Sequence, residues 1–482
     1  MTQDPFAAPI LVWLRRDLRL RDNPALSAAA ASGRPVVPVF LWDPVFDALG
    51  AAPRFRFGRG LSQFQTCLKQ LGSALVLRRG EALNALQQLV AETGATALYW
   101  NRQYDPGGID RDRRIKKQLS DSGLEVRSFM GNLLCEPWQV KTGSGGHYRV
   151  YSPFWRALSR QDIAPPLPAP THLRPPVQWP QSDALVTWQL DRPMQRGAEV
   201  VAPHLRVGEA AAQVQLAAFL EEKLPNYADH RDLPAQPATS GLSEPLAYGE
   251  VSARDIWHQT ALRTGGEVAH KFLKELAWRD FAWHLTYHDP HILTSCWRPE
   301  WQGFHWHEDT QAAVFQAWRQ GRTGIPLVDA GMRELFVTGK MHNRVRMVVA
   351  SFLTKHLRMH WRLGQAWFAD TLVDWDPASN AMGWQWVAGC GPDAAPYFRI
   401  FNPETQRAKF DPDQCYTRRW LAELSPDPGP EALAFFDAAP RQWQVDPAQG
   451  YPSPIVDLAA GRQAALAALV QFKAGAEHPL NE

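Results

Sequence analysis

Cysteine is scarce in this chain of 482 residues, which has only five, and none stands at metal-finger or CxxC spacing. The sequence therefore predicts neither a disulfide framework nor a zinc or iron–sulfur site. Long apolar runs are also missing, since none approaches the ~20 residues that a membrane helix needs. The first residues, MTQDPFAAP, lack the basic-then-apolar order of a signal peptide. We expect a cytoplasmic protein with no membrane partner and no metal.

An excess of charge of one sign is absent too. Lysine and arginine number 51, aspartate and glutamate 49, and the formal net charge is +2. Any binding to nucleic acid would therefore need a local basic face. The stretch LRRDLRLRDN after the first apolar run has no glycine fingerprint for a dinucleotide, which disfavours an ordinary nucleotide-dependent oxidoreductase.

Tryptophan, in contrast, is abundant, with 21 residues. Core packing explains most of such an excess, and surfaces that stack planar ligands can explain the rest. The stretch AMGWQWVAG, residues 381–389, sets Trp384 and Trp386 two positions apart. On a helix these side chains point about 200° apart. We expect one indole to face a core and the other a cavity.

The first part of the chain alternates short apolar runs with helix-like stretches that end at glycine. This alternation predicts a parallel sheet covered on both faces, with any ligand beyond the carboxyl ends of the strands. The chain is also too long for one ordinary core, which predicts two domains. The expected strands are Ile10–Leu14, Val36–Leu41, Ala74–Leu77 and Ala97–Trp100, and the helix-like stretches are Asn23–Gly33, Gly60–Gly72 and Glu81–Gly94.

A proline-rich stretch separates this part from a helical remainder. Residues 165–203 hold nine prolines, which favours a semi-rigid connector. We expect an α/β parallel-sheet (Rossmann-like) domain over residues 1–135, a linker over 136–206 and an all-α domain over 207–482. The expected helices of the last part are Glu209–Lys223, Val268–His288, Thr310–Gln320, Pro326–Thr338, Met341–Met359 and Leu363–Leu372.

Two of these helices carry polar side chains at positions that share a face. In KELAWRDF, Glu275 and Trp278 are three apart, which suits a site that stacks a ring and hydrogen-bonds its edge. A surface glutamate beside a core tryptophan is the alternative. In MHNRVRMVVASF, Asn343 and Met347 share a face, which favours a polar pocket in an apolar wall.

The same stretch holds two arginines, Arg344 and Arg346, that point apart. A buried arginine needs a carboxylate, and Asp374 and Asp376 are the candidates. A solvated arginine pair remains the alternative. Farther upstream, the hydroxyls and amides of TSGLS, residues 239–243, can cradle a phosphate, as many turns can.

Taken together and in this order, these segments resemble the photolyase/cryptochrome flavoproteins, most closely the class I-type photolyases of cyclobutane pyrimidine dimers. The resemblance covers nearly the whole chain and implies an antenna-binding α/β domain followed by a helical FAD domain. It is carried by LVWLRRDLRLRDNPAL (Leu11–Leu26), TSGLS, KELAWRDF, TGIPLVDAGMREL (Thr323–Leu335), MHNRVRMVVASFLTK, DWDPASNAMGWQW, DAAPYFRIFNP (Asp393–Pro403) and GYPSPIVD (Gly450–Asp457).

The resemblance implies where FAD is held. Arg346 and Asp374 would form an ion pair against the isoalloxazine, Asp376 would lie at its polar edge and Asn380 would face its N5. The implied cofactor-binding residues are Tyr227, Thr239, Ser240, Gly241, Leu242, Ser243, Phe272, Glu275, Arg279, Asn343, Arg346, Asp374, Asp376 and Asn380.

It also implies that excited FADH⁻ passes an electron to a pyrimidine dimer flipped out of DNA. Trp278 and Trp386 would wall the dimer, Glu275 and Asn343 would bond its edges, and Met347 would complete the wall. Glu275 would need to share a proton to stabilise the added electron, and a desolvated pocket favours protonation. With Asn380 these form the implied catalytic set. Trp384, Trp361 and Trp306 would relay electrons, and the implied DNA contacts are Trp278, Arg344, Trp386, Arg399 and Lys409, with Arg279, Arg418 and Arg419 as further rim candidates.

Related activities make different demands on the same positions. Plant-type cryptochromes, which signal blue light, tend to carry Asp where this chain has Asn380. Enzymes for (6-4) photoproducts use histidines at the positions of Asn343 and Met347, so cyclobutane dimers are the expected substrate here. A monomeric enzyme is also expected. The stretch QYDPGGID has Gly107 and Gly108 where some folate-binding members carry Asn-Glu, so a folate in another mode, a deazaflavin, FMN or no antenna remain open. Lys340 replaces an aromatic residue common in the family.

Overall fold

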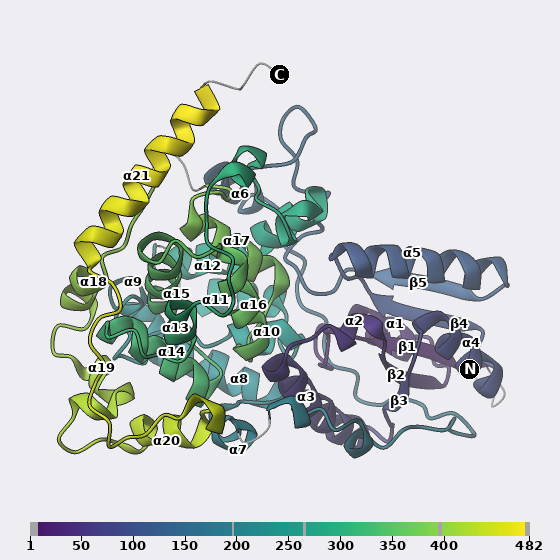
Figure 1. The fold of residues 1–482 in the computed structure, drawn as a ribbon. Coiled ribbons are helices and arrows are strands. Elements are labelled where there is room, and N and C mark those ends of the chain that lie inside the picture. The colour runs from purple at the N-terminus through teal and green to yellow at the C-terminus, as the bar shows by residue number, and fades with distance from the viewer. Residues whose placement is uncertain (1–7, 195–196, 264–266, 394–397, 478–482) are drawn as a thin grey trace.

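The computed structural model describes residues 8–194, 197–263, 267–393 and 398–477. Figure 1 shows a small α/β part and a larger helical part side by side, with the C-terminal helix along the outer edge of the helical part. This is the expected order of an α/β domain followed by helices. None of the described helices is both long and apolar enough to cross a bilayer.

The sheet of the first part has five parallel strands in the order β3-β2-β1-β4-β5. Four of them match the expected apolar runs, and β5, with the sequence EVRSF, was not expected. It lies at the edge of the sheet with an exposed or half-exposed side chain at every position, so it lacks the apolar run that marks a buried strand. The strands are β1 Ile10–Leu14, β2 Val36–Trp42, β3 Val76–Arg79, β4 Ala97–Asn101 and β5 Glu125–Phe129.

Helices cover both faces of this sheet. Residues of α1 (Pro24–Ala31) and α3 (Ala51–Gln70) pack with Ile10, Val12 and Leu14 of β1. Residues of α4 (Ala82–Thr93) and α5 (Pro106–Asp121) pack with Leu11 and Trp13 on the other face. Because strand side chains alternate, one continuous apolar strand supplies both cores. A short helix, α2 (Pro44–Asp47), follows β2.

The proline-rich connector is fastened to the sheet domain. The Asp22 amide donates to the Leu167 carbonyl at 2.8 Å, and the Val36 amide donates to the Arg174 carbonyl at 2.8 Å. The region after β5 also contains short helices: α6 Tyr151–Leu158, η1 Leu185–Trp188, η2 Arg192–Met194, α7 Gly197–Val201 and η3 Ala202–His204.

The second part is helical, and no strand lies beyond Phe129 among the described residues. Two expected helices change pitch: α8 passes into a π-helical turn, η4, and α15 passes into another, η8. The elements are α8 Glu209–Ala218, η4 Phe219–Lys223, η5 Leu224–Asn226, α9 Tyr227–His230, α10 Ser243–Tyr248, α11 Ala253–Arg263, α12 Glu267–His288, η6 Pro290–Leu293, η7 Pro299–Gly303, α13 Ala313–Arg319, α14 Pro326–Thr338, α15 Asn343–Ser351, η8 Phe352–His356, α16 Trp361–Thr371, α17 Pro377–Ala388, α18 Pro403–Phe410, α19 Cys415–Trp420, η9 Ala422–Leu424, α20 Pro430–Ala438, η10 Arg441–Trp443 and α21 Leu458–Glu477.

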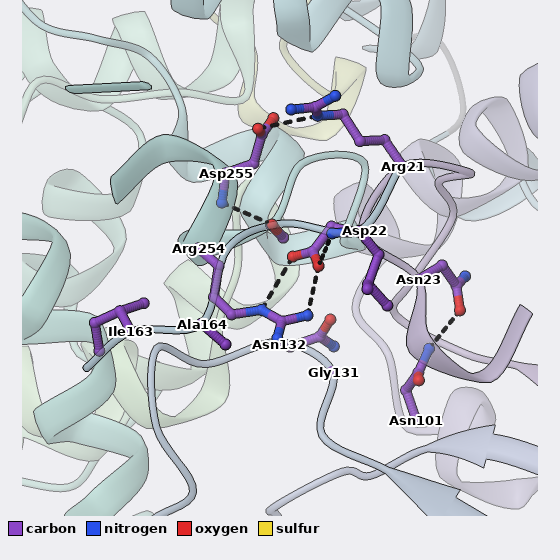
Figure 2. Close-up of polar contacts among 12 residues, drawn as sticks. Arg21, Asp22, Asn23, Asn101, Gly131, Asn132, Ile163, Ala164, Arg254 and Asp255 are labelled. Carbon is purple, nitrogen blue, oxygen red and sulfur yellow. Dashed lines mark hydrogen bonds and ion pairs between the residues drawn. The ribbon is translucent and has the colours of Figure 1, made fainter. Parts of the chain in front are cut away.

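Ion pairs join the two parts. Arg254 pairs with Asp22, and Arg21 pairs with Asp255 at 3.0 Å, as Figure 2 shows. Beside the second of these, the stretch after β1 is bonded to α8, because the Leu20 amide donates to Glu209 at 2.7 Å.

A deeper cluster surrounds Arg56 of α3, which is fully buried and pairs with both Glu244 and Glu250 at 2.5 Å. Lys340 adds a further cation here, because its Nζ lies 2.6 Å from Glu244 and donates to the His204 carbonyl at 2.8 Å. Lys340 therefore serves the junction between the two parts.

Candidate functional site

A cavity of about 650 Å³ lies within the helical part, where α12, α15 and α17 converge. Most residues expected at the site line it: Tyr227, Ser240, Leu242, Ser243, Phe272, Glu275, Trp278, Arg279, Asn343, Arg344, Arg346, Met347, Asp374, Asp376, Asn380, Trp384 and Trp386. The remaining expected residues do not line it in the part of the chain that the structure describes: Thr239, Gly241, Trp306, Trp361, Arg399, Lys409, Arg418 and Arg419.

An arginine–aspartate pair forms the ionic part of the wall. Arg346 donates from Nη2 to Asp374 at 2.8 Å and from Nε to the Met341 carbonyl at 2.8 Å. Arg344, two residues earlier, instead donates to Asp232 at 2.7 Å. The two arginines therefore point apart, as expected. The other oxygen of Asp374, Oδ1, is buried without a partner, so it can accept a hydrogen bond from a bound molecule.

Asp376, the other candidate partner for Arg344 or Arg346, lies 3.9 Å from Arg279 and also anchors a helix. Its side chain caps α17 by accepting the Ser379 amide at 2.8 Å, and it accepts the Trp283 indole N–H at 2.9 Å. One turn later, Asn380 donates from Nδ2 to the Gln365 carbonyl at 3.0 Å, which fixes the amide toward α16. The start of α17 thus sets the direction of Asn380 in the cavity wall.

Glu275 and Trp278 form the α12 side of the cavity. Glu275 is ion-paired with Arg231, so its carboxylate has a cationic partner rather than a purely apolar surrounding. Trp278 stacks on Tyr151 of α6, with ring centroids 3.6 Å apart and planes 10° apart. Arg231 and Tyr151 were not expected from the sequence. Arg231 stands four residues after Tyr227, a helical spacing that could have revealed it, whereas Tyr151 comes from the linker and gives no such signal.

The two indoles of α17 have different surroundings. Trp384 is buried and meets Trp318 and Phe368 edge-on, at centroid distances of 6.1 and 5.0 Å. Trp386 is half-buried, and the Arg399 guanidinium lies 5.1 Å from its ring centroid. Both indoles line the cavity, and they differ in the side chains that they pack against away from it.

Trp361 and Trp306 lead from this region toward the surface. Trp361 is fully buried at the start of α16, and Trp306 is partly exposed. The His360 ring lies between them, 5.5 Å from Trp361 and 5.0 Å from Trp306 by ring centroids. Trp384 reaches α16 at Gly364, where an added Cβ would lie 2.0 Å from its ring. The chain Trp384, Trp361 and Trp306 therefore follows α16 outward.

Cations gather beside α18 at the edge of the same region. Arg344 and Lys409 both lie over the Phe410 ring, at 4.4 and 5.1 Å from its centroid. Arg399 lies over Trp386 at the cavity wall. Residues 394–397 of the neighbouring DAAPYFRIFNP motif lie outside the described part. No group of three or more metal-ligating side chains occurs among the described residues.

The carboxyl edge of the sheet, where a ligand was also expected, is filled by ion pairs. Arg15 pairs with Asp112 at 3.1 Å, and Arg111 pairs with Asp43 at 2.7 Å. Asp105 caps α5 by accepting the Gly108 amide at 2.6 Å. A Cβ at residue 108 would lie 2.8 Å from that carboxylate, which explains a glycine there.

Known proteins are similar to this chain over almost its whole length. Residues 10–171 match the family model for DNA photolyase, and residues 272–471 match that for the FAD binding domain of DNA photolyase. The deoxyribodipyrimidine photo-lyase of Agrobacterium fabrum is 45% identical over 97% of this chain and 98% of its own. Cryptochrome-1 of Arabidopsis thaliana is 36% identical over 93% of this chain and 68% of its own. The crystal structure of a bacterial class III photolyase from Agrobacterium tumefaciens has a TM-score of 0.89 and 44% identity, covering 98% of this chain and 99% of the other.

The chain therefore belongs to the photolyase/cryptochrome family. The resemblance inferred from the ordered motifs is confirmed, and so is the fold class. The class I-type assignment stays a prediction, since the solved relative is named class III.

Proposed function

We propose that this protein uses light to repair cyclobutane pyrimidine dimers in DNA, with reduced FAD as its cofactor. The observation that carries the proposal is one cavity of about 650 Å³ that joins the Arg346–Asp374 ion pair to an aromatic wall of Trp278 and Trp386. The ionic part suits the polar edge of a flavin, and the aromatic part suits an extruded pyrimidine dimer.

The residues present fit FAD. Asp374 offers a buried oxygen without a partner, and Arg346 beside it offers a positive charge. The hydroxyls of Ser240 and Ser243 line the same cavity and suit phosphates or a ribityl chain. When bound as FADH⁻, the cofactor supplies a light-excited electron to the dimer and receives it back after the ring opens.

The protein's own side chains would bind and orient the lesion. A dimer inside a duplex is out of reach, and a poorly stacked damaged pair costs least to extrude. Trp278 and Trp386 would stack on it, at ~1–3 kcal/mol per base. Tyr151, stacked at 3.6 Å behind Trp278, holds that indole in place. Glu275 and Asn343 would bond the edges of the bases, and Met347 would exclude water from the remaining wall.

Light-dependent removal of dimers tests this function. The purified protein is mixed with an oligonucleotide that holds one defined dimer, and the remaining dimer is quantified by chromatography after darkness or near-UV and blue light. We expect removal only under light. Binding of the oligonucleotide with no loss of dimer under light would support the signalling alternative instead.

The alternative function is a blue-light-sensing cryptochrome, and the 36% identity to Cryptochrome-1 of Arabidopsis thaliana favours it. The geometry of Asn380 favours repair. Its Nδ2 group donates to the Gln365 carbonyl at 3.0 Å, and the aspartate typical of plant cryptochromes has no N–H to donate. The amide therefore fits this site where an aspartate would place two acceptors together.

We further propose that Trp384, Trp361 and Trp306 relay electrons to oxidised FAD. Trp384→Phe removes the first indole, so photoreduction of oxidised flavin should be lost while repair by chemically reduced protein persists. Flavin absorbance and dimer removal measure the two effects separately. Trp188→Phe, a buried change in the α/β part, is the matched control. Loss of both activities in Trp384→Phe alone would show that the indole is structural.

A second, light-harvesting chromophore is also proposed, from among a folate, a deazaflavin and FMN. The absorption spectrum of the protein before and after extraction identifies it. A spectrum that FAD alone accounts for would contradict this proposal.

A further inference from the structure

Two cysteines from distant parts of the chain lie together beside the middle of the proposed relay. Cys296, between η6 and η7, is 4% exposed, and Cys390, just beyond α17, is 0% exposed. Both are free thiols. Neither has a part in the cavity wall or in dimer repair as described above.

The backbone around both cysteines is locked in place. The Arg298 amide donates to the Cys390 carbonyl at 3.1 Å. Gln385, on the last turns of α17, accepts the Trp297 amide at 2.7 Å and donates to the Ser295 carbonyl at 3.0 Å. The segment on both sides of Cys296 is therefore bonded to the end of α17, and Cys390 Sγ lies 4.0 Å from the same Gln385 Oε1.

The two thiols interact directly. A hydrogen bond with the Cys390 thiol is the strongest influence on Cys296 and lowers its pKa. Burial raises the pKa of Cys390, and the neighbouring Cys296 raises it further. Cys296 is thus the thiol that ionises more readily, and Cys390 is the neighbouring thiol that keeps its proton.

Trp361 adjoins this pair. Its indole N–H is buried without a nitrogen or oxygen partner, and the indole interacts with the Cys296 thiol. A reduced thiol therefore lies against the residue that, in the proposed relay, is transiently oxidised. The arrangement differs from that of Cys135, which is buried in another cluster with Leu133 and Tyr151.

A buried amine completes the cluster. Lys355 of η8 is fully buried, donates to the Ala388 carbonyl and lies 3.3 Å from the Phe398 ring centroid. Burial lowers the pKa of Lys355 well below its usual value, and Cys390 is the titratable group that acts on it.

We propose that Cys296 and Cys390 form an internal dithiol that donates electrons to Trp361, so that light reduces oxidised FAD with no external reductant. The inference rests on the tryptophan relay proposed above. Two S–H bonds break and one S–S bond forms, which releases two electrons and two protons. FAD takes both electrons and one proton to become FADH⁻, and the other proton passes to solvent. Each absorbed photon moves one electron, and a small thiol reductant returns the disulfide to the dithiol.

The test uses the full-length protein with oxidised FAD, under anaerobic conditions and without added reductant. Blue light is applied, flavin absorbance is followed, and free cysteines are alkylated and identified by mass spectrometry. We expect one disulfide between Cys296 and Cys390 for each FADH⁻ formed. Reduced flavin with both thiols still open to alkylation in the unfolded protein would overturn the proposal, and this readout needs no variant.

Substitutions separate the dithiol from the relay. Cys296→Ser and Cys390→Ser should each abolish photoreduction without reductant. Added dithiothreitol should restore photoreduction in both variants. Cys135→Ser, which removes a buried thiol from a different cluster, should behave as the parent. Photoreduction of either serine variant at the parent rate without reductant would overturn the dithiol. Failure of the parent even with dithiothreitol would overturn the relay and the dithiol with it, while light-driven repair by chemically reduced protein would still stand.

Discussion

At the scale of single residues, the short spacing of Asp374 and Asp376 does not predict which aspartate pairs with Arg346 and which caps a helix. The sequence predicts that an arginine on α15 needs a carboxylate, and the structure supplies one, because Asp374 accepts from Arg346 at 2.8 Å. It does not predict that Asp376 caps α17. The cap depends on where the helix begins, and both aspartates lie within three residues of its first residue, Pro377.

Buried carboxylates also couple stability to pH. Asp280 of α12 accepts the Leu134 amide at 2.6 Å, and burial raises its pKa to about 7. An aspartate in the unfolded chain has a pKa of about 3.9. Between these values the folded state holds a proton that the unfolded state has lost, so this contribution to stability falls as pH rises from about 4 to 7.

We therefore expect the free energy of unfolding of the parent, relative to Asp280→Asn, to fall by about 2–4 kcal/mol across that pH window. Urea denaturation of both proteins between pH 4.5 and 8 measures the difference, in which other titrating groups cancel. Asp110→Asn, at an exposed position of α5, should give a difference that does not change with pH. Parallel curves for the parent and Asp280→Asn would contradict the burial argument.

At the scale of elements, the apolar pattern predicts those segments that are largely buried in a core. The expected strand Ile10–Leu14 and helix Pro326–Thr338 have the predicted bounds. The apolar pattern does not predict the edge strand β5, because its side chains are largely exposed. The sequence does not predict the π-helical turns η4 and η8, because the apolar pattern continues through them while the backbone hydrogen bonds change partner.

The contact of α16 with α17 depends on the absence of one methyl group. A Cβ at Gly364 would lie 2.0 Å from the Trp384 ring. Gly364→Ala should therefore displace this indole, destabilise the protein by about 1–3 kcal/mol and slow flavin photoreduction. Thermal unfolding and flavin absorbance measure the two effects.

Gly107→Ala is the matched helical control for this change, because its added Cβ would meet only Asp105 Oδ2, at 3.7 Å. We expect no loss of stability there. An unchanged melting temperature for Gly364→Ala would mean that Trp384 has room to move. This result would contradict a fixed position of Trp384 in the relay.

At the scale of the whole molecule, a net charge of +2 means that DNA affinity must come from one face. Lys409, beside Arg344 over Phe410, is a candidate phosphate contact. Lys409→Gln should weaken binding to damaged and undamaged DNA alike and reduce the slope of log K against log salt by about 0.9.

Fluorescence anisotropy over a range of salt concentrations measures this slope. Lys117→Gln on α5, in the other half of the molecule, should leave it unchanged. An equal slope for Lys409→Gln and the parent would remove Lys409 from the DNA surface.

The division into an α/β part and a helical part could be predicted from the sequence, because it follows from local alternation and the proline-rich stretch. The junction between the parts could not. Arg56 meets Glu244 and Glu250 across 188 and 194 residues of chain, and no local pattern pairs positions so far apart. The same holds for Tyr151 behind Trp278 and for the meeting of Cys296 with Cys390.

Arg56 has a consequence for how such proteins recombine. A chimera that took its N-terminal half from a relative with an uncharged side chain at this position would leave the buried Glu250 without its arginine, while Glu244 would keep Lys340. Crossovers between homologous genes should therefore give a stable protein only when the arginine and both glutamates come from compatible parents.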